Sequence, residues 1–166
     1  MHRPIALLLA LISSVFVGCT PPAEEPILTG PDSWMAFRDK NGKWGFKAGN
    51  KIVIKATYDA VLPFKLDRAR VRIDGKFGFI DDSAELVIPA KYDEADQFFD
   101  GLAKVKLGDK YGFLDTSGKT VIPIELDYAE SFESGTALVK RNGEPGKIDT
   151  EGTFTAETST GKTVNE

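Results

Sequence analysis

The chain has 166 residues, of which 42% are hydrophobic and 28% charged, a composition typical of one soluble domain. Its formal net charge is −4 and it has no run of four Lys or Arg, which argues against a nucleic-acid partner. The single cysteine excludes an intramolecular disulfide.

The first predicted element is a targeting segment. Arg3 precedes an apolar run, residues 5–17, which is too short to span a bilayer comfortably and is typical of a signal peptide. The run ends in Phe16-Val17-Gly18-Cys19, which resembles the lipobox of bacterial lipoproteins. The resemblance implies cleavage before Cys19, acylation of Cys19 and, because Thr20 follows it, attachment to the outer membrane. An ordinary secretory signal with an incidental cysteine is the alternative.

The chain divides into four parts. We expect a signal peptide at 1–18, a lipidated cysteine and proline-rich tether at 19–33, a β domain at 34–155 and a disordered tail at 156–166. Four prolines between residues 19 and 32 oppose regular structure and favour an extended tether. The expected partner of this part is the lipid bilayer, bound through acylated Cys19.

The β domain repeats a unit about every 34 residues. Four alanines are separated by 33, 34 and 34 residues, and a glycine follows each alanine by nine. The pairs are Ala36 and Gly45, Ala69 and Gly78, Ala103 and Gly112, and Ala137 and Gly146. This register predicts a repeat array in which neighbouring units bury a shared core.

One unit shows the expected local structure. Residues 69–73 alternate apolar and charged side chains, and Asp74-Gly75 then predicts a hairpin turn. Residues 77–80 and 86–88 are two further short strands, the last ended by Pro89. The connector, residues 90–101, is compatible with a fourth irregular strand or with a helical turn.

These motifs resemble the WG repeat family, over about residues 34–154. Trp44-Gly45 is the literal dipeptide, whereas Phe77 and Tyr111 keep only the aromatic character. The resemblance implies a β-rich module. We expect all-β tandem β-meander repeats of about 34 residues, three full and a partial fourth. We expect these three-stranded units to stack as a short solenoid-like module, since the repeats are too few for a closed propeller.

The aromatic–glycine positions have two interpretations. Trp44, Phe77 and Tyr111 could form a ladder that stacks on sugar rings, or a spine in the core. We favour the core, in which the adjacent glycines allow close approach of a neighbouring backbone, because Phe77 is a poor choice for a solvated sugar site. The predicted structural motif residues are Trp44, Gly45, Phe77, Gly78, Tyr111, Gly112 and Gly146.

No catalytic site or cofactor is predicted. The only histidine, His2, is lost with the signal peptide, so neither a nucleophile–histidine pair nor a zinc site can form in the mature chain. Carboxylates remain as possible Ca²⁺ ligands or glycosidase residues, as in the acidic connector 93–100. However, Asp59, Asp93 and Asp127 recur with the repeat, which favours a structural role in turns.

A basic stripe and two tyrosines are the candidate interaction surface. Alternation predicts that the stripe lies on one face, where it either meets an acidic partner or is a solvated strand face. The tyrosines are candidates for exposed contacts. The six residues are Arg70, Arg72, Lys104, Lys106, Tyr58 and Tyr92.

The expected function is non-catalytic binding of a protein or another envelope component through the repeat surface. The first alternative is binding of an envelope glycan such as peptidoglycan. A less favoured alternative is a carboxylate-dependent glycan hydrolase, which requires two acids facing each other in a cleft.

Overall fold

The computed structural model describes residues 33–157, which form fifteen strands and no α-helix. The expected all-β repeat architecture is confirmed. The predicted signal peptide, Cys19, the segment up to residue 32 and residues 158–166 of the predicted tail lie outside the described residues. The predicted start of the tail at residue 156 is wrong, because Ala156 ends β15 and Glu157 N–H donates to Pro145 O at 3.0 Å. Among residues 33–157, no helix is long and apolar enough to cross a membrane.

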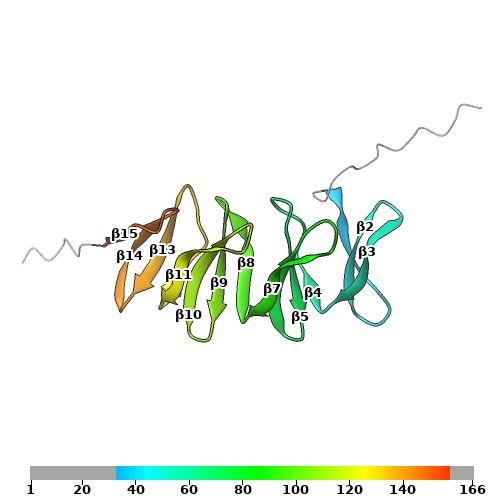
Figure 1. Ribbon diagram of the computed structural model, residues 1–166, viewed down its shortest axis with the longest axis horizontal. Helices are drawn as coiled ribbons and strands as arrows, with labels where there is room; N and C mark the ends of the chain where they lie inside the picture. Colours follow the sequence, from blue (N-terminus) through cyan, green and yellow to red (C-terminus); the bar gives the residue numbers. More distant parts are fainter. Residues whose placement is uncertain (1–32, 158–166) are drawn as a thin grey trace, which may run out of the picture.

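Four antiparallel sheets follow one another along the long axis of the molecule (Figure 1). Sheet 1 contains β1 (Met35–Arg38), β2 (Trp44–Ala48) and β3 (Lys51–Tyr58). Sheet 2 contains β4 (Ala60–Val61), β5 (Ala69–Ile73), β6 (Lys76–Ile80) and β7 (Leu86–Tyr92). Sheet 3 contains β8 (Glu94–Phe99), β9 (Leu102–Leu107), β10 (Lys110–Asp115) and β11 (Thr120–Leu126). Sheet 4 contains β12 (Tyr128–Ala129), β13 (Thr136–Arg141), β14 (Glu144–Asp149) and β15 (Phe154–Ala156).

The connectors are strands, and each belongs to the sheet that follows it. β4, β8 and β12 pair with β5, β9 and β13. The expected three-stranded unit is therefore wrong for sheets 2, 3 and 4, which have four strands, and right for sheet 1. The physical reason is that the connector at the end of one sequence repeat pairs its backbone with the first strand of the next repeat. For example, Asp93 N–H donates to Lys106 O at 2.9 Å.

Each hydrophobic core lies between two consecutive sheets. The same ring contact recurs in each core, where the Phe after the WG-type glycine meets a Phe at the start of the next sheet. Ring centroids are 4.9 Å apart for Phe46 and Phe64, 4.9 Å for Phe79 and Phe98, and 4.8 Å for Phe113 and Phe132. All six rings are at most 6% exposed. Because a single sheet cannot bury these rings alone, the sheets stabilise one another by stacking.

The residue that fills the core is not the one that we expected. Trp44, Phe77 and Tyr111 are only half-buried, although we predicted them as the core spine. The fully buried rings belong to Phe46, Phe79 and Phe113, two residues later.

In each motif, the glycine between the two aromatic residues packs against the backbone of the neighbouring strand. A Cβ on Gly78 would lie 2.5 Å from Ile88 O, and one on Gly45 would lie 2.4 Å from Ile54 O. The approach comes from irregular pairing of β6 with β7, which carries extra residues opposite the glycine. A side chain at this position would therefore force the two strands apart.

Turn aspartates begin the loop between the third and fourth strands of sheets 2 to 4. Asp115 Oδ1 accepts the N–H groups of Ser117 and Lys119 at 2.9 and 3.0 Å. Asp81 and Asp149 make the same pair of bonds two and four residues ahead. These bonds lock the turn and account for the recurrence of aspartate there.

Candidate functional site

One residue of the predicted basic stripe, Arg70, contacts the next sheet. Arg70 Nη1 donates to Ala95 O of sheet 3 at 2.5 Å, and the Arg70 guanidinium lies 4.7 Å from the centroid of the Phe77 ring. Burial lowers the pKa of Arg70, an effect that the nearby Asp96 carboxylate partly offsets. Arg72 also lies over Phe77, at 5.5 Å, and its side chain is exposed.

The two lysines of the stripe are paired within sheet 3. Lys104 Nζ lies 2.9 Å from Asp96 Oδ2, and Lys106 Nζ lies 3.0 Å from Glu94 Oε1. Asp96 also accepts a hydrogen bond from Ser131 Oγ of the next repeat, at 2.6 Å. The stripe is therefore largely a set of contacts within and between sheets, and the idea of a wholly solvated face is wrong.

The predicted exposure of Tyr58 and Tyr92 is also wrong. Tyr58 is 8% exposed and Tyr92 is 3% exposed, because both belong to hydrophobic cores between sheets. Tyr128, at the start of sheet 4, is 47% exposed. It is the most exposed of the four tyrosines.

The connector aspartates join the hairpins of consecutive sheets. Asp93 pairs with Lys76 in sheet 2 and accepts the Gly108 N–H of sheet 3 at 2.8 Å. Asp127 makes the same two interactions, with Lys110 and with Gly143 N–H at 2.7 Å. The hydrogen bond from the lysine, followed by that from the glycine, holds the pKa of each carboxyl below its ordinary value.

The carboxylates gather no metal-type cluster. Among residues 33–157, no group of three or more His, Cys, Asp and Glu side chains is arranged to hold a metal ion. The recurrent aspartates instead bind lysines and backbone N–H groups, as the structural interpretation predicted.

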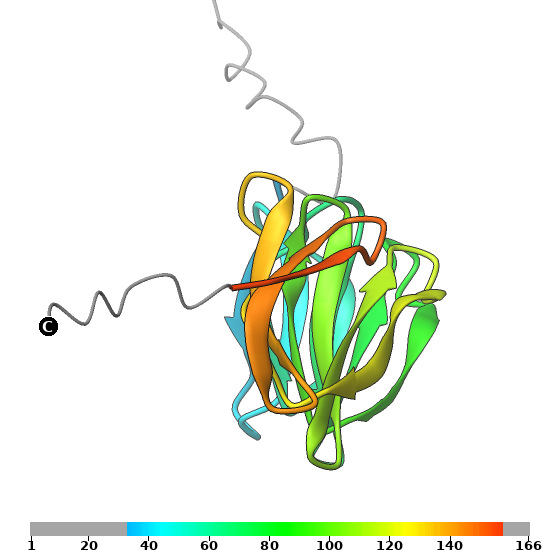
Figure 2. The same cartoon turned by 90° about the vertical axis from the view of Figure 1, so that its left-hand side faces the viewer.

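The outer face of sheet 4 differs from the faces inside the stack. Counting 34 residues from sheet 3, Leu138 stands in place of Lys104 and Lys147 in place of the core residue Phe113. No fifth sheet follows in the described residues, so this face ends the stack, and Figure 2 views the molecule from this end. The lost aromatic at Pro145 and the charged Lys147 fit a face that meets solvent rather than another sheet.

Substitutions on this face also remove the counterparts of both ion pairs that sheet 3 forms. The Lys104–Asp96 pair becomes Leu138 beside Glu130, and the Lys106–Glu94 pair becomes Lys140 opposite Tyr128. Glu130 Oε1 accepts the Tyr128 hydroxyl at 3.0 Å, and this bond raises the pKa of Tyr128. Glu130 and Lys140 thus lack the ion-pair partners that their counterparts have.

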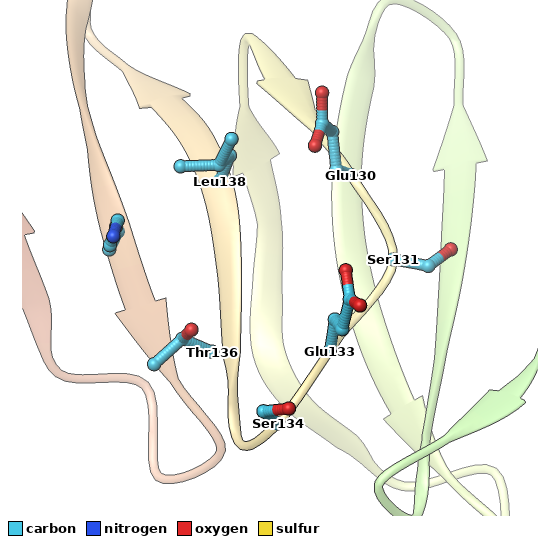
Figure 3. A pocket seen from close by; sticks show the side chains of 7 residues that line it. Glu130, Ser131, Glu133, Ser134, Thr136 and Leu138 are labelled. Carbon is cyan, nitrogen blue, oxygen red and sulfur yellow. The ribbon is translucent and has the colours of Figure 1, made fainter.

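Two adjoining pockets lie on this face, which we call the distal face. The first, of about 280 Å³, includes Glu130, Glu133 and Leu138 in its lining, and Figure 3 shows the two glutamates projecting from the segment between β12 and β13. The second, of about 250 Å³, adds Tyr128 and Pro145 and shares Glu130 and Leu138 with the first. Leu138 is 43% exposed. The face therefore combines apolar surface with charges of both signs.

The candidate interaction surface predicted from the sequence includes neither Leu138 nor Tyr128 and does not join them into a site. The signal that could have joined them is the replacement of aromatic and cationic repeat positions in the last unit. Such replacements are expected where a repeat array ends.

The comparisons with known proteins give one family. No curated protein matches the chain. The family model for the WG containing repeat matches three consecutive segments, residues 48–77, 77–111 and 111–144. Each matched segment begins near the second strand of a hairpin and ends in the next sheet, so the family repeat spans one core between sheets. Since the matches cover more than half of the chain, the protein belongs to the WG containing repeat family.

Proposed function

We propose that the protein is an envelope lipoprotein whose WG-repeat stack is a non-catalytic binding module for a protein partner. Residues 1–18 would be the signal peptide, acyl chains on Cys19 would hold the protein in the outer membrane, and residues 19–33 would be the tether. The support is the lipobox resemblance at Phe16-Val17-Gly18-Cys19. Two or three acyl chains suffice for a lasting anchor, since each buried methylene contributes about 0.8 kcal/mol.

The distal face is the proposed binding site for the partner. Inside the stack, apolar faces are buried and the basic side chains are engaged, whereas the distal face exposes Leu138 and Tyr128 and leaves Glu130 and Lys140 without their usual partners. An exposed aromatic and aliphatic pair rimmed by charges is typical of a protein interface. The face is also at the opposite end of the stack from β1, where the tether would enter (Figure 1).

A non-catalytic role is consistent with the carboxylates. Those aspartates whose pKa is shifted have it lowered, by lysines, hydroxyls and backbone N–H groups. A general acid in glycoside cleavage needs the opposite shift. Incubating the protein with purified cell wall should therefore release no soluble fragments, and release would overturn this part of the proposal.

Site-specific photo-crosslinking in intact cells tests the proposed site. A photoreactive residue at Leu138 should give a discrete adduct with one envelope protein. The matched control is Leu107, which is 45% exposed against 43% for Leu138 but lies in the hairpin of sheet 3. An adduct from both positions, or from neither, would contradict binding through the distal face.

Glycan binding is the second candidate, and the exposed ring of Tyr128 beside Glu130 favours it. Aromatic faces stack on sugars, and carboxylates accept hydrogen bonds from hydroxyl groups. In this case the protein would sediment with insoluble cell wall, and Tyr128→Ala would abolish the sedimentation. The photoreactive residue at Leu138 would then give no adduct with a protein.

A further inference from the structure

The outer face of sheet 1 is the other end of the stack, and it combines apolar side chains with cationic ones. Phe46 points into the core with sheet 2, so its neighbour Lys47 points outward. Met35 and Ile52 pair with Lys47 from β1 and β3, which places all three on the outer face. Met35 is 54% exposed and Ile52 is 57% exposed. Phe37, two residues after Met35, is partly exposed on the same face.

Inside the stack the positions of Met35, Phe37 and Lys47 are buried against the preceding sheet, whereas the counterpart of Ile52 is Leu86, which is 41% exposed. Ala69 pairs with Ile80 just as Met35 pairs with Lys47, and Val71 corresponds to Phe37 opposite the glycine. Ala69, Val71 and Ile80 are at most 1% exposed. Sheet 1 therefore keeps apolar side chains on a face that no preceding sheet covers in the described residues. We call Met35, Phe37, Lys47 and Ile52 the proximal face. Lys51, which pairs with Ala48, points to the opposite side of β3 and lies at the rim of this face.

Charge is strongly polarised along the stack. Residues 33–58 contain six cationic side chains and one carboxylate, Asp39, whereas residues 59–157 contain thirteen cations and twenty carboxylates. One of the six cations, Lys43, pairs with Asp59. The six cations are Arg38, Lys40, Lys43, Lys47, Lys51 and Lys55. Neither Lys47 nor Lys51 forms an ion pair with a described residue. An acidic protein thus has one basic end, and that end is sheet 1.

The chain position of this basic end matters. Residues 19–32 lie between the proposed lipid site and sheet 1, and fourteen residues reach at most about 50 Å when extended. Sheet 1 is consequently the part of the stack that follows directly from the anchor, while the acidic sheets come later. The lipid surface is the partner that this arrangement brings to the proximal face.

We infer that the proximal face docks on the anionic lipid surface that carries the anchor, an inference that rests on the proposed lipidation of Cys19. Met35, Phe37 and Ile52 enter the boundary between head groups and acyl chains, and Lys47 and Lys51 bind lipid phosphates. The acidic remainder of the stack is repelled by the same surface. The molecule then stands upright, with the distal face turned away from the membrane.

A second copy of the chain fits this face less well. Two proximal faces in contact would bring Lys47 and Lys51 against their own copies, and like charges oppose such an interface. Three apolar side chains also provide far less than the roughly 800 Å² per partner that a stable interface buries. Lipid accepts the apolar residues and pairs with the lysines.

Depth-dependent fluorescence quenching tests the orientation on the full lipidated protein in vesicles of phosphatidylethanolamine and phosphatidylglycerol. One label is attached at Asn50→Cys, in the turn between β2 and β3, and the matched label at Glu151→Cys, in the corresponding turn of sheet 4. Acylation blocks the thiol of Cys19, the only native cysteine. Spin-labelled phospholipid should quench the Asn50 label several-fold more than the Glu151 label. The difference should shrink at 1 M salt, where the screening length falls to about 3 Å.

Two variants sharpen the test. Changing Met35 and Ile52 to Ser together with Lys47 and Lys51 to Glu should abolish the preferential quenching, while the protein still floats with vesicles through its acyl chains. Changing Lys119 and Lys147 to Glu makes the same change in net charge and should leave the quenching intact.

The remaining outcomes would overturn either the docking or the lipoprotein proposal. Equal or absent quenching of both labels on vesicle-bound protein overturns the docking but leaves the anchor standing. Failure to float with vesicles, or flotation unaffected by Cys19→Ala, overturns the lipoprotein proposal itself. A dimer crosslinked through Asn50→Cys, without quenching, would assign the proximal face to a second copy and overturn docking on lipid.

Discussion

The carboxylate of Asp93 binds two hairpins at once: Oδ2 accepts the Gly108 N–H of sheet 3 at 2.8 Å, and Oδ1 pairs with Lys76 of sheet 2. Asp127 repeats the arrangement between sheets 3 and 4. Asp59 pairs with Lys43 of sheet 1 at 2.5 Å and lies against the hairpin of sheet 2. The sheets are thus joined along one edge by charge-assisted bonds and through their faces by aromatic rings.

Stability should fall in acid because of these aspartates. The pKa values of Asp59, Asp93 and Asp127 are lowered in the folded state. Their contribution is therefore present above the unfolded value of about 3.9 and is lost as the pH falls through the folded pKa. Urea unfolding at pH 7 and pH 3 should show a clear loss at pH 3. Changing all three to Asn should reduce this loss, and an unchanged pH dependence would contradict the assignment.

Removing one of the interlocked rings should cost far more than removing its half-exposed neighbour. Phe79→Ala deletes a ring that is 1% exposed and should cost about 3–5 kcal/mol of unfolding free energy. Phe77→Ala, at the half-buried WG position, is the matched control and should cost much less. In a double-mutant cycle, Phe79 and Phe98 should couple by about 0.5–1.5 kcal/mol. Equal losses for Phe77 and Phe79 would show that the WG aromatic is the core residue after all.

The glycine of the WG-type motif should not tolerate a methyl group. In Gly78→Ala the Cβ would lie 2.5 Å from Ile88 O and 2.7 Å from Ala90 N, both backbone atoms. We expect a loss of about 3 kcal/mol, the upper part of the range for overpacking. Gly49→Asn is the control, because Gly49 has a φ of 57° with no atom within 4 Å of the new Cβ. Since Asn tolerates this conformation, its cost should stay below about 1 kcal/mol. Urea unfolding of both variants decides the matter.

Lys147 stands where the inner sheets have a core phenylalanine, so we expect it to prevent a further sheet from stacking on sheet 4. Lys147→Phe restores the aromatic found at Phe113 and exposes it on the distal face, so the variant should self-associate while remaining folded. Sedimentation velocity should show larger species that grow with concentration. Lys119→Phe, in an exposed turn, should remain as monomeric as the parent. If both variants associate equally, the effect is general hydrophobicity rather than loss of the cap.

The sequence predicts most of the local structure, because turns and alternation are local properties. Asp74-Gly75 forms the expected hairpin, whereas Asp59, Asp93 and Asp127 join the hairpins of consecutive sheets instead of starting turns.

What the sequence does not predict is which neighbour covers each face. Tyr92 is buried because sheet 3 stacks on β7, and Arg70 is engaged because it meets Ala95 O of β8. The choice between Phe77 and Phe79 as the core ring depends on the same stacking, since alternation alone does not say how deeply each side chain is covered. For the same reason the distal face depends on the absence of a further sheet after sheet 4 within residues 33–157.

The repeated contact between phenylalanine rings also sets a regular spacing between the sheets. Stacked sheets lie about 10 Å apart, so the three interlocked gaps place the far end roughly 30 Å from the first sheet. Inserting one more interior repeat would move a bound partner outward by one such step and leave both end surfaces unchanged. The copy number of the motif is thus a spacing that evolution or an engineer can adjust in whole increments.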